Sequence, residues 1–539
     1  MGKTRFSTQF WVVFLLSAVL LGSVTTWGKV IYVDDDAAGA NNGTSWADAY
    51  KFLQDALADA NSSEKPVEIR VAQGVYQPDR SAAEPNGTAD REATFQLISG
   101  VALKGGYAGF GQPDPNARNI ELYETILSGD LDGNDVDVDS ALDLWYDPGR
   151  AENSYHVVTG SGTNETAVLD GLTITGGNAD GVNLQKKDRG GGMYTTYGDP
   201  IITNCTFIEN SASYLGGGAM YNYRSSPTLR GCVFKTNVAS RAGGGMFNTS
   251  GRPKLAECTF VDNAAYPASM AGLVLAHYGG GLYNVASNLT LTDCTLYRNY
   301  ALFSGGAMYS KGSDLSLTNC LLIGNSAFYA GGAATLSEEG SVKLINCTLG
   351  GNRARVGSAL DVLHTTGEYP IEAINCILWD GGNEIRSQDT NNVLVSYSVT
   401  QGGWAGQGNI DADPCFAEPG FWTDPCNTPD NLWDDGWTDG DWHIKSQAGR
   451  WNPNTESWVV DDVTSPCIDA GDPLSPIGYE PFPNGGIINM GAHGGTAEAS
   501  KSYFGKPPCE TIVAGDINGD CKVNFLDFRL MALHWLEDR

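Results

Sequence analysis

The strongest constraint on the fold is a repeat that can be aligned on its cysteines. Seven cysteines follow one another at steps of 27, 26, 36, 26, 27 and 29 residues: Cys205, Cys232, Cys258, Cys294, Cys320, Cys347 and Cys376. A phenylalanine or leucine stands two residues after each. Five residues after the first six stands an asparagine: Asn210, Asn237, Asn263, Asn299, Asn325 and Asn352. Self-similarity at this period is typical of a solenoid, in which each repeat buries its apolar face against its neighbours.

Within each repeat, apolar residues alternate in two runs of opposite parity. Leu289 and Leu291 share one parity in the copy NLTLTDCTLYRN, and Cys294 and Leu296 share the other. Period-two apolar residues form one face of a strand, and an odd step between two runs requires a bend. We therefore expect a short strand, a bend at Asn, Asp or Gly just before the cysteine, and a second strand. The Gly-Gly-x-Met stretch supplies a third, which predicts one rung of a right-handed parallel β-helix.

Stacking of the rungs explains the repeated residue types. Equivalent residues lie about 4.8 Å apart in neighbouring rungs, so asparagines can hydrogen-bond along a corner while Cys and Met fill the interior. The repeat cysteines are odd in number and point in parallel into the core. We expect free, buried thiols there, with bridging between rungs as the alternative. Cys509 and Cys521 bracket a short loop and are the candidate disulfide.

Net charge and the N-terminus bear on partners and location. Lys and Arg number 33 and Asp and Glu 63, a formal net charge of −30, which argues against a nucleic-acid partner. Lys3 and Arg5 precede an apolar run from Phe10 to Leu21, the pattern of a secretory signal. An uncleaved anchor is the alternative. We expect a secreted or cell-surface protein, with outer-membrane association left open.

Aromatic residues leave two questions open. Seven of the thirteen tryptophans lie between Gln401 and Trp458: Trp404, Trp422, Trp433, Trp437, Trp442, Trp451 and Trp458. They suit binding to a sugar ring, but we favour packing as a lid on the last coils. The second set follows the Met or Leu of five repeats: Tyr194, Tyr221, Phe247, Tyr283 and Tyr309. These form an outward stripe if the preceding Met points inward, and belong to the core otherwise.

The flanking segments complete the organisation. Val30–Val33 and Val67–Val71 are predicted strands, and apolar spacing predicts a helix from about Ser45 to Ala60 with Ser45 as its N-cap, covering the open end of the solenoid. The expected division is 1–28 signal peptide, 29–100 N-terminal cap and entry strands, 101–400 β-helix coils, 401–505 Trp-rich coils and exit segment, and 506–539 calcium loop and helix. The predicted fold class is all-β, a single-stranded right-handed parallel β-helix with a capping helix and a small C-terminal helical module.

The C-terminal segment carries the most specific metal-binding pattern. Oxygen donors stand at positions 1, 3, 5, 9 and 12 of a loop, with a backbone carbonyl at position 7: Asp516, Asn518, Asp520, Asn524, Asp527 and Lys522. Hard oxygen ligands at these offsets predict a Ca²⁺ site of EF-hand type, followed by an apolar helix from Phe528 to Leu536. An Asp-rich turn without an ion is the alternative.

These motifs carry resemblances to known families. The Gly-Gly-Ala/Gly-Met-Tyr and Phe-x-x-Asn unit resembles the repeats of polymorphic outer membrane proteins, and the whole chain resembles secreted β-helix proteins of the pectin lyase-like fold from planctomycete-like bacteria. IYVDDDAAGANNGTSWADAY is similar to that family's entry segment, and SPCIDAGDP to its exit segment. The C-terminal loop resembles half of a dockerin. Cys521 replaces the expected Gly and only one loop is present, which puts a cohesin-like partner in doubt.

The chemistry of the solenoid is left as two hypotheses. The first is a non-catalytic protein that binds glycans or other extracellular partners through its faces. The alternative is a polysaccharide lyase or glycoside hydrolase, which would need acidic ligands with an Arg or Lys base on adjacent rungs, or paired aspartates with His. AHGG at Ala492 and HIKS at His443 depart from the hydrolase motifs, and Lys235, Arg241 and Arg298 are more typical of solvated corners. We therefore predict no catalytic residues.

Overall fold

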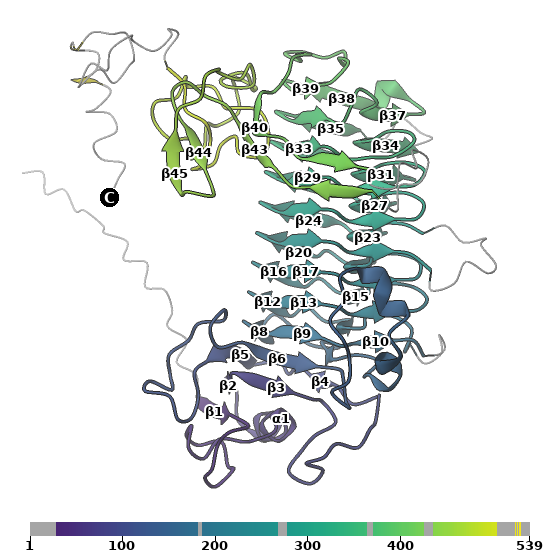
Figure 1. Cartoon of the computed structure of the whole chain (residues 1–539), viewed down its shortest axis with the longest axis vertical. Helices are drawn as coiled ribbons and strands as arrows, with labels where there is room; N and C mark the ends of the chain where they lie inside the picture. Colours follow the sequence, from purple (N-terminus) through teal and green to yellow (C-terminus); the bar gives the residue numbers. More distant parts are fainter. Residues whose placement is uncertain are drawn as a thin grey trace, which may run out of the picture.

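The computed structural model is a parallel β-helix with an N-terminal cap at one end, and the strands β40 to β45 lie beside its last rungs (Figure 1). The structure describes residues 28–181, 186–267, 277–363, 370–424 and 435–503, and four isolated positions beyond them. The predicted fold class is confirmed for the solenoid. Several predictions lie outside the described residues: the signal segment, Trp433, the Cys509–Cys521 disulfide and the six Ca²⁺ ligands.

Four parallel sheets run along the solenoid, and a complete regular rung contributes one strand to each, in the order sheet 1, sheet 2, sheet 4, sheet 3. Sheet 1 contains β1 (Lys29–Val33), β2 (Val67–Ala72), β5 (Val101–Tyr107), β8 (Val168–Asp170), β12 (Ile201–Thr203), β16 (Thr228–Arg230), β20 (Lys254–Ala256), β24 (Leu289–Thr292), β28 (Leu315–Thr318), β32 (Val342–Ile345), β35 (Ile371–Ile374) and β38 (Val393–Ser396). Sheet 2 contains β3 (Gly74–Tyr76), β6 (Thr125–Ser128), β9 (Thr173–Thr175), β13 (Thr206–Ile208), β17 (Val233–Lys235), β21 (Thr259–Val261), β25 (Thr295–Tyr297), β29 (Leu321–Ile323), β33 (Thr348–Gly350), β36 (Ile377–Trp379) and β39 (Val399–Thr400).

Sheet 3 contains β4 (Phe95–Gln96), β7 (Val158–Thr159), β11 (Met193–Thr196), β15 (Met220–Tyr223), β19 (Met246–Thr249), β23 (Leu282–Val285), β27 (Met308–Lys311), β31 (Ala334–Ser337), β34 (Leu360–Leu363) and β37 (Ile385–Ser387). Sheet 4 was not predicted. Its strands hold two residues each: β10 (Asn178–Ala179), β14 (Ser211–Ala212), β18 (Val238–Ala239), β22 (Ala264–Ala265), β26 (Tyr300–Ala301) and β30 (Ser326–Ala327). All but β10 follow directly after a repeated asparagine, so the asparagine corner turns the chain into a further short ladder.

The bend before each cysteine is confirmed. The residues just before the seven repeat cysteines all have φ between 49° and 60°: Asn204, Gly231, Glu257, Asp293, Asn319, Asn346 and Asn375. Asn, Asp and Gly reach this left-handed region at least cost. Glu257 is the one departure from the predicted residue types. This bend lets the side chains of both sheet 1 and sheet 2 point inward.

The interior is built of stacked ladders, as predicted. The seven repeat cysteines are free and buried, so bridging between rungs does not occur. Phe207, Phe234 and Phe260 stack with ring centroids 4.9 and 4.5 Å apart. Along the corner each asparagine donates from Nδ2 to the Oδ1 of the next, from Asn210 through Asn352, at 2.9 to 3.1 Å. Because these amides are buried, the ladder satisfies polar groups that would otherwise be costly.

The aromatic stripe lies on the outer side of sheet 3 but is not open to solvent. Met193 and its equivalents are buried in the interior, which directs the following aromatics outward. There they stack on one another, Tyr194 on Tyr221 at 5.7 Å and Tyr283 on Tyr309 at 5.4 Å. The stacking and the adjoining loops leave four of the five less than 9% exposed.

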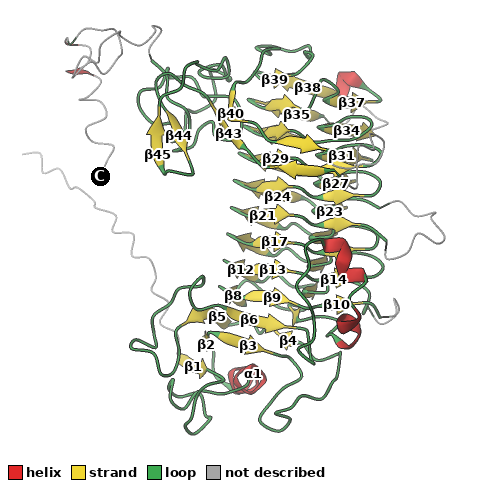
Figure 2. Ribbon diagram, viewed as in Figure 1, coloured by secondary structure: helices red, strands yellow, loops and turns green. Residues whose placement is uncertain are grey.

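The capping helix was placed wrongly at its N-terminal end. Helix α1 (Leu53–Ser62) begins at Leu53 rather than Ser45 (Figure 2). Ser45 caps a turn instead, where its Oγ accepts from Asp48 N at 3.1 Å. The segment cannot be helical because Tyr50 pairs with β1, donating to Tyr32 O and accepting from Asp34 N. The two predicted cap strands are confirmed as β1 and β2.

Three 3₁₀ helices and three antiparallel hairpins complete the described elements. The helices are η1 (Ala141–Trp145), η2 (Pro148–Glu152) and η4 (Thr390–Asn392). The hairpins pair β40 (Phe416–Glu418) with β43 (Asp441–Ile444), β41 (Phe421–Thr423) with β42 (Gly436–Thr438), and β44 (Arg450–Asn452) with β45 (Ser457–Val459). Within the described ranges, no helix has the length and apolar character needed to cross a membrane.

Candidate functional site

A groove of about 430 Å³ opens on the outer face of the solenoid where sheets 2 and 4 meet. Its floor is formed by the corners of consecutive rungs. One wall is the start of η1, and the other is the tryptophan hairpin, defined as β41 and β42. The lining residues are Asp139, Ser140, Ala141, Leu142, Asp262, Asn263, Ala264, Arg298, Tyr300, Ser326, Trp422, Asp435 and Trp437.

Arg298 occupies the centre of this floor. It and Asp262 stand at equivalent bends of adjacent rungs, both with positive φ. Arg298 binds Asp262 through two hydrogen bonds, Nε to Oδ1 at 2.8 Å and Nη2 to Oδ2 at 2.7 Å. Its Nη1 donates to Asp439 Oδ2 at 2.7 Å. The hydrogen bonds that Arg298 donates to Asp262 raise the pKa of Arg298 above its ordinary value, even though burial acts in the opposite direction.

The tryptophan hairpin is held against the rungs by close packing. A Cβ at Gly324 or Gly351 would overlap the Trp437 ring, so these glycines, which directly follow β29 and β33 of sheet 2, let the indole approach the solenoid closely. Trp422 Nε1 donates to Gly351 O at 2.6 Å. Arg353 forms a salt bridge with the buried carboxylate of Asp435, which directly precedes β42.

The tryptophans predicted to form a lid fall into a buried and a partly exposed set. Trp442 is buried and packs on Phe416 at 4.8 Å, as a lid would. Trp422 and Trp437 lie 5.1 Å apart at 58°, and both remain partly exposed to the groove. The same hairpin therefore covers the last coils and lines the groove.

The opposite wall is fixed by a segment from the irregular early coils. Ser140 caps η1 by accepting from Leu142 N. Ala141 and Leu144 pack on Val238 and Ala264 of sheet 4. Trp145 Nε1 donates to Tyr266 O at 3.2 Å. The groove is thus bordered by two segments outside the repeat, nearly three hundred residues apart in sequence.

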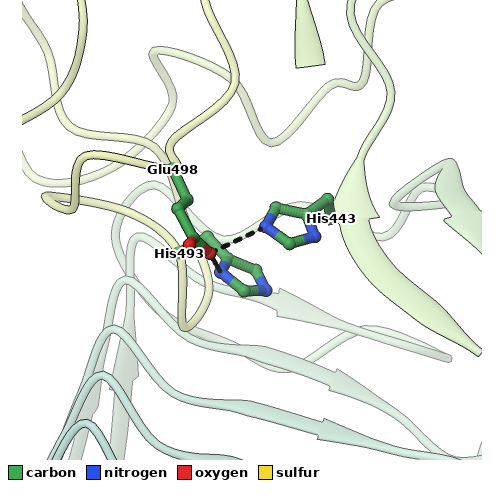
Figure 3. Close-up of side chains that lie close together, drawn as sticks. All are labelled: His443, His493 and Glu498. Carbon is green, nitrogen blue, oxygen red and sulfur yellow. Dashed lines mark hydrogen bonds and ion pairs between the residues drawn. The ribbon is translucent and has the colours of Figure 1, made fainter. Parts of the chain in front are cut away.

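A second cluster, the histidine site, consists of His443, His493 and Glu498 (Figure 3). His443 lies on β43, and the other two lie in the exit segment that packs over sheet 2. Their ligand atoms lie within 4.8 Å of one another. Glu498 Oε2 is 3.3 Å from His443 Nε2 and 3.9 Å from His493 Nδ1. The two imidazole rings stack with centroids 3.6 Å apart.

Charged neighbours and burial shift the pKa values of the groups in and around this cluster. Asp441 Oδ1 accepts from His443 Nδ1 at 2.7 Å, and Asp441 Oδ2 accepts from Arg450 at 2.6 Å. Burial would raise the pKa of Asp441, but the hydrogen bonds from His443 outweigh it and the pKa is lowered. Burial, and then the neighbouring His443, lower the pKa of His493 to about 3. His493 is a neutral imidazole at neutral pH.

Sequence reasoning missed both clusters. His443 and His493 were considered only as parts of hydrolase motifs and set aside, and they meet across fifty residues. Arg298 was assigned to a solvated corner, whereas it anchors the groove. Lys235 is indeed exposed at the end of β17. The scarcity of histidine, six in the chain, was the one signal that could have drawn attention to a pair in the exit region.

Three comparisons with known proteins bear on the class of protein to which this chain is similar. A model of the right-handed β-helix region matches residues 156–354, and a model described as disaggregatase related matches residues 429–471. A pectate lyase, Pel9A, is similar at 13% identity and a TM-score of 0.45, covering 86% of this chain and 96% of its own. A rhamnogalacturonan lyase is similar at 12% and 0.44, covering 72% and 91%. No curated protein matches.

The chain contains a right-handed parallel β-helix. Residues 429–471, in its C-terminal part, are similar to a family described as disaggregatase related. This segment spans His443 and Arg450 of the histidine site and Asp435 and Trp437 of the groove. The fold by itself does not define an activity, because the same fold hosts many functions.

Proposed function

We propose that this chain is an exported, non-catalytic β-helix protein that binds a neutral polysaccharide in the groove. The observation that carries the proposal is the pair Trp422 and Trp437, set beside the ion-paired Arg298. Indole faces bind the apolar face of a sugar, while carboxylates and guanidinium groups bind its hydroxyls. The groove offers both kinds of surface along one line of rungs.

The polar groups of the groove are fixed before any ligand binds. Asp262 and Asp439 hold Arg298 from two sides, and Trp437 Nε1 donates to Asp439 Oδ1 at 2.8 Å. A site whose side chains are already ordered loses less conformational entropy on binding. The arrangement therefore supports recognition of a ligand by a preformed surface.

The charge of the groove favours a neutral glycan over a uronate polymer. Carboxylates line or border it: Asp139, Asp262, Asp435 and Asp439. Arg298 and Arg353 are already paired with three of these. Together with the net charge of −30, this leaves an acidic surface that would repel a polyanion.

A second candidate is a polysaccharide lyase. One observation favours it: Arg298 lies beside a carboxylate of the adjacent rung, Asp262, and a carboxylate at the end of the tryptophan hairpin, Asp439. A base must give up its proton to act, however, and the raised pKa of Arg298 opposes this. Asp262 and Asp439 are also occupied by the same guanidinium. The geometry supports binding better than proton abstraction.

Affinity gel electrophoresis of the full chain against neutral and acidic polysaccharides tests the proposal. We expect retardation by at least one neutral polysaccharide, abolished or strongly reduced by Trp422→Ala. Trp458→Ala, in the separate hairpin β44–β45, is the matched control and should be retarded like wild type. Equal retardation of wild type and Trp422→Ala, or retardation by acidic polysaccharides alone, would exclude this groove as a neutral-glycan site.

The lyase candidate is tested on the same preparations. Acidic polysaccharides are incubated with the protein, with and without Ca²⁺, and the ultraviolet absorbance of unsaturated product is followed. We expect no product. Product formation that is lost in Arg298→Gln would replace the binding proposal with the enzymatic one.

A further inference from the structure

The histidine site has the spacing of a metal centre. In a tetrahedral Zn²⁺ site with ligand bonds of about 2.0–2.1 Å, two donor atoms lie about 3.3–3.4 Å apart. His443 Nε2 and Glu498 Oε2 are already 3.3 Å apart. His493 Nδ1 is 3.9 Å from the same oxygen. Because the two rings stack at 3.6 Å and an imidazole binds a metal in its own plane, the His493 ring must also rotate out of the stack for both nitrogens to face one ion.

The hydrogen bonds of His443 direct a free electron pair toward Glu498. Asp441 accepts from Nδ1, which leaves Nε2 as the nitrogen that carries the lone pair when the ring binds a metal. That lone pair faces a carboxylate oxygen, and two acceptors at this distance repel unless a proton or a cation lies between them. A carboxylate on the far nitrogen is also the usual support of a zinc-bound histidine.

Asp441 is itself held in place. Arg450 donates to Asp441 Oδ2 at 2.6 Å and forms a salt bridge with Asp461 at 3.1 Å. Ser446 N donates to Asp461 Oδ2 at 2.9 Å. The series Asp461, Arg450, Asp441 therefore fixes the ring orientation of His443 from β43 and the neighbouring hairpin.

The exit segment is anchored just as firmly on the other side. Ala492 N donates to Thr348 Oγ1 at 2.9 Å, and Asn346 Nδ2 donates to Gly494 O at 3.0 Å. His493 is thereby held over sheet 2. The Glu498 side chain is 49% exposed, which leaves solvent access for a fourth ligand.

We propose that His443, His493 and Glu498 bind one divalent transition-metal ion, with Zn²⁺ as the ion that the two imidazoles and one carboxylate fit. Two histidines and one glutamate form a known zinc donor set, with a solvent molecule in the fourth position. The ion joins β43 to the exit segment. This inference is independent of glycan binding in the groove.

Zinc titration of the full chain, stripped with a chelator and followed by calorimetry, tests the proposal. Glu498→Gln removes one anionic ligand from an exposed position, and Glu338→Gln, also exposed, is the matched control. We expect wild type and Glu338→Gln to bind one Zn²⁺ ion tightly. In Glu498→Gln the affinity for this ion should fall by more than the roughly 10- to 100-fold that loss of a supporting residue costs.

Cobalt substitution gives a second readout. Co²⁺ bound by two imidazoles and a carboxylate in tetrahedral geometry produces intense visible bands, and these should be lost in His493→Asn. Unchanged zinc stoichiometry and affinity in Glu498→Gln, or no tight zinc in wild type, would overturn the proposal.

Discussion

The regular rungs and the C-terminal segment from Trp404 to Tyr503 use their residues in opposite ways. Each rung repeats the same inward Cys, Phe or Leu and Asn, so each position is satisfied by its own copy in the next rung. The C-terminal segment has no repeat and pairs its strands in antiparallel hairpins. It nevertheless supplies the histidine site and one wall of the groove. Residues that stack on their own copies make a regular surface. The histidines, and the tryptophans that border the groove, come from the non-repeating C-terminal segment that packs over this surface.

The largest test of this comparison concerns the interior ladder. Phe234 is fully buried between Phe207 and Phe260. Phe234→Ala should lower the free energy of unfolding by about 3–5 kcal/mol, because it removes a buried ring and leaves a cavity. Chemical denaturation followed by far-ultraviolet circular dichroism measures this. Trp458→Ala, partly exposed in the C-terminal segment, should change the same quantity by less than about 0.5 kcal/mol. Similar losses in both variants would contradict the contrast.

The next prediction concerns a buried carboxyl that supports the exit segment. Burial raises the pKa of Glu480 to about 7, although its Oε1 accepts from Asn489 N and Gly495 N. The folded state thus holds the proton more tightly than the unfolded state. The resulting loss of stability is absent below about pH 4.5, grows as pH rises toward 7, and is constant above it.

Glu480→Gln removes this penalty while keeping the acceptor. We expect little change in the free energy of unfolding at pH 4 and an increase of about 3 kcal/mol at pH 8, where wild type must ionise the buried carboxyl and the variant need not. Denaturation at both pH values measures it. An equal effect at pH 4 and pH 8 would show that the proton on Glu480 is not involved.

A smaller effect is expected at the support of the histidine site. Asp441→Asn replaces the carboxylate that orients His443 and leaves the three proposed ligands unchanged. Zinc affinity should fall by about 10- to 100-fold, the usual cost of losing such a partner. Competition with a chromophoric chelator gives the affinity. A variant with wild-type affinity would mean that β43 packing alone orients the ring.

The smallest expected effect on the solenoid comes from the predicted calcium loop. Ca²⁺ should increase helical circular dichroism of the full chain, and Asp516→Ala should remove that increase, because the loop then loses its first ligand. Mg²⁺ should act much less, since it requires a smaller octahedral shell. Unfolding of the rungs should be unchanged by either ion. Identical responses of the two proteins to Ca²⁺ would leave an Asp-rich turn without an ion.

The rungs could be predicted from the sequence because the same contacts recur in every repeat, at a nearly constant spacing along the chain. The parity change around Cys294 and the spacing to Asn299 define strands, bend and corner locally. Sheet 4 escaped notice because two residues such as Ser211 and Ala212 are too short to show a period. The start of α1 was misplaced because Tyr50 is held by strand β1, a contact that helical spacing does not reveal.

The functional clusters could not be predicted in the same way. His443 and His493 meet only because Thr348 and Asn346 bind the exit segment. Trp437 reaches the groove only because Gly324 and Gly351 leave room for it. These contacts link single residues from distant parts of the chain, and no periodic pattern marks them. Tertiary docking, rather than local preference, determines both clusters.

The asparagine ladder gives the solenoid an electrical direction. Every side-chain amide in the row donates a hydrogen bond toward the C-terminal end of the solenoid. At the other end of the row, Asn210 Oδ1 accepts a hydrogen bond from Gly177 N. Aligned amides add their dipoles, as peptide units do along an α-helix. The positive end of the row meets a carboxyl, since Asn352 Nδ2 donates to Asp380 Oδ1 at 3.1 Å. The two ends of this stack are therefore not interchangeable. A rung added after Asn352 would need a hydrogen-bond acceptor at its asparagine position.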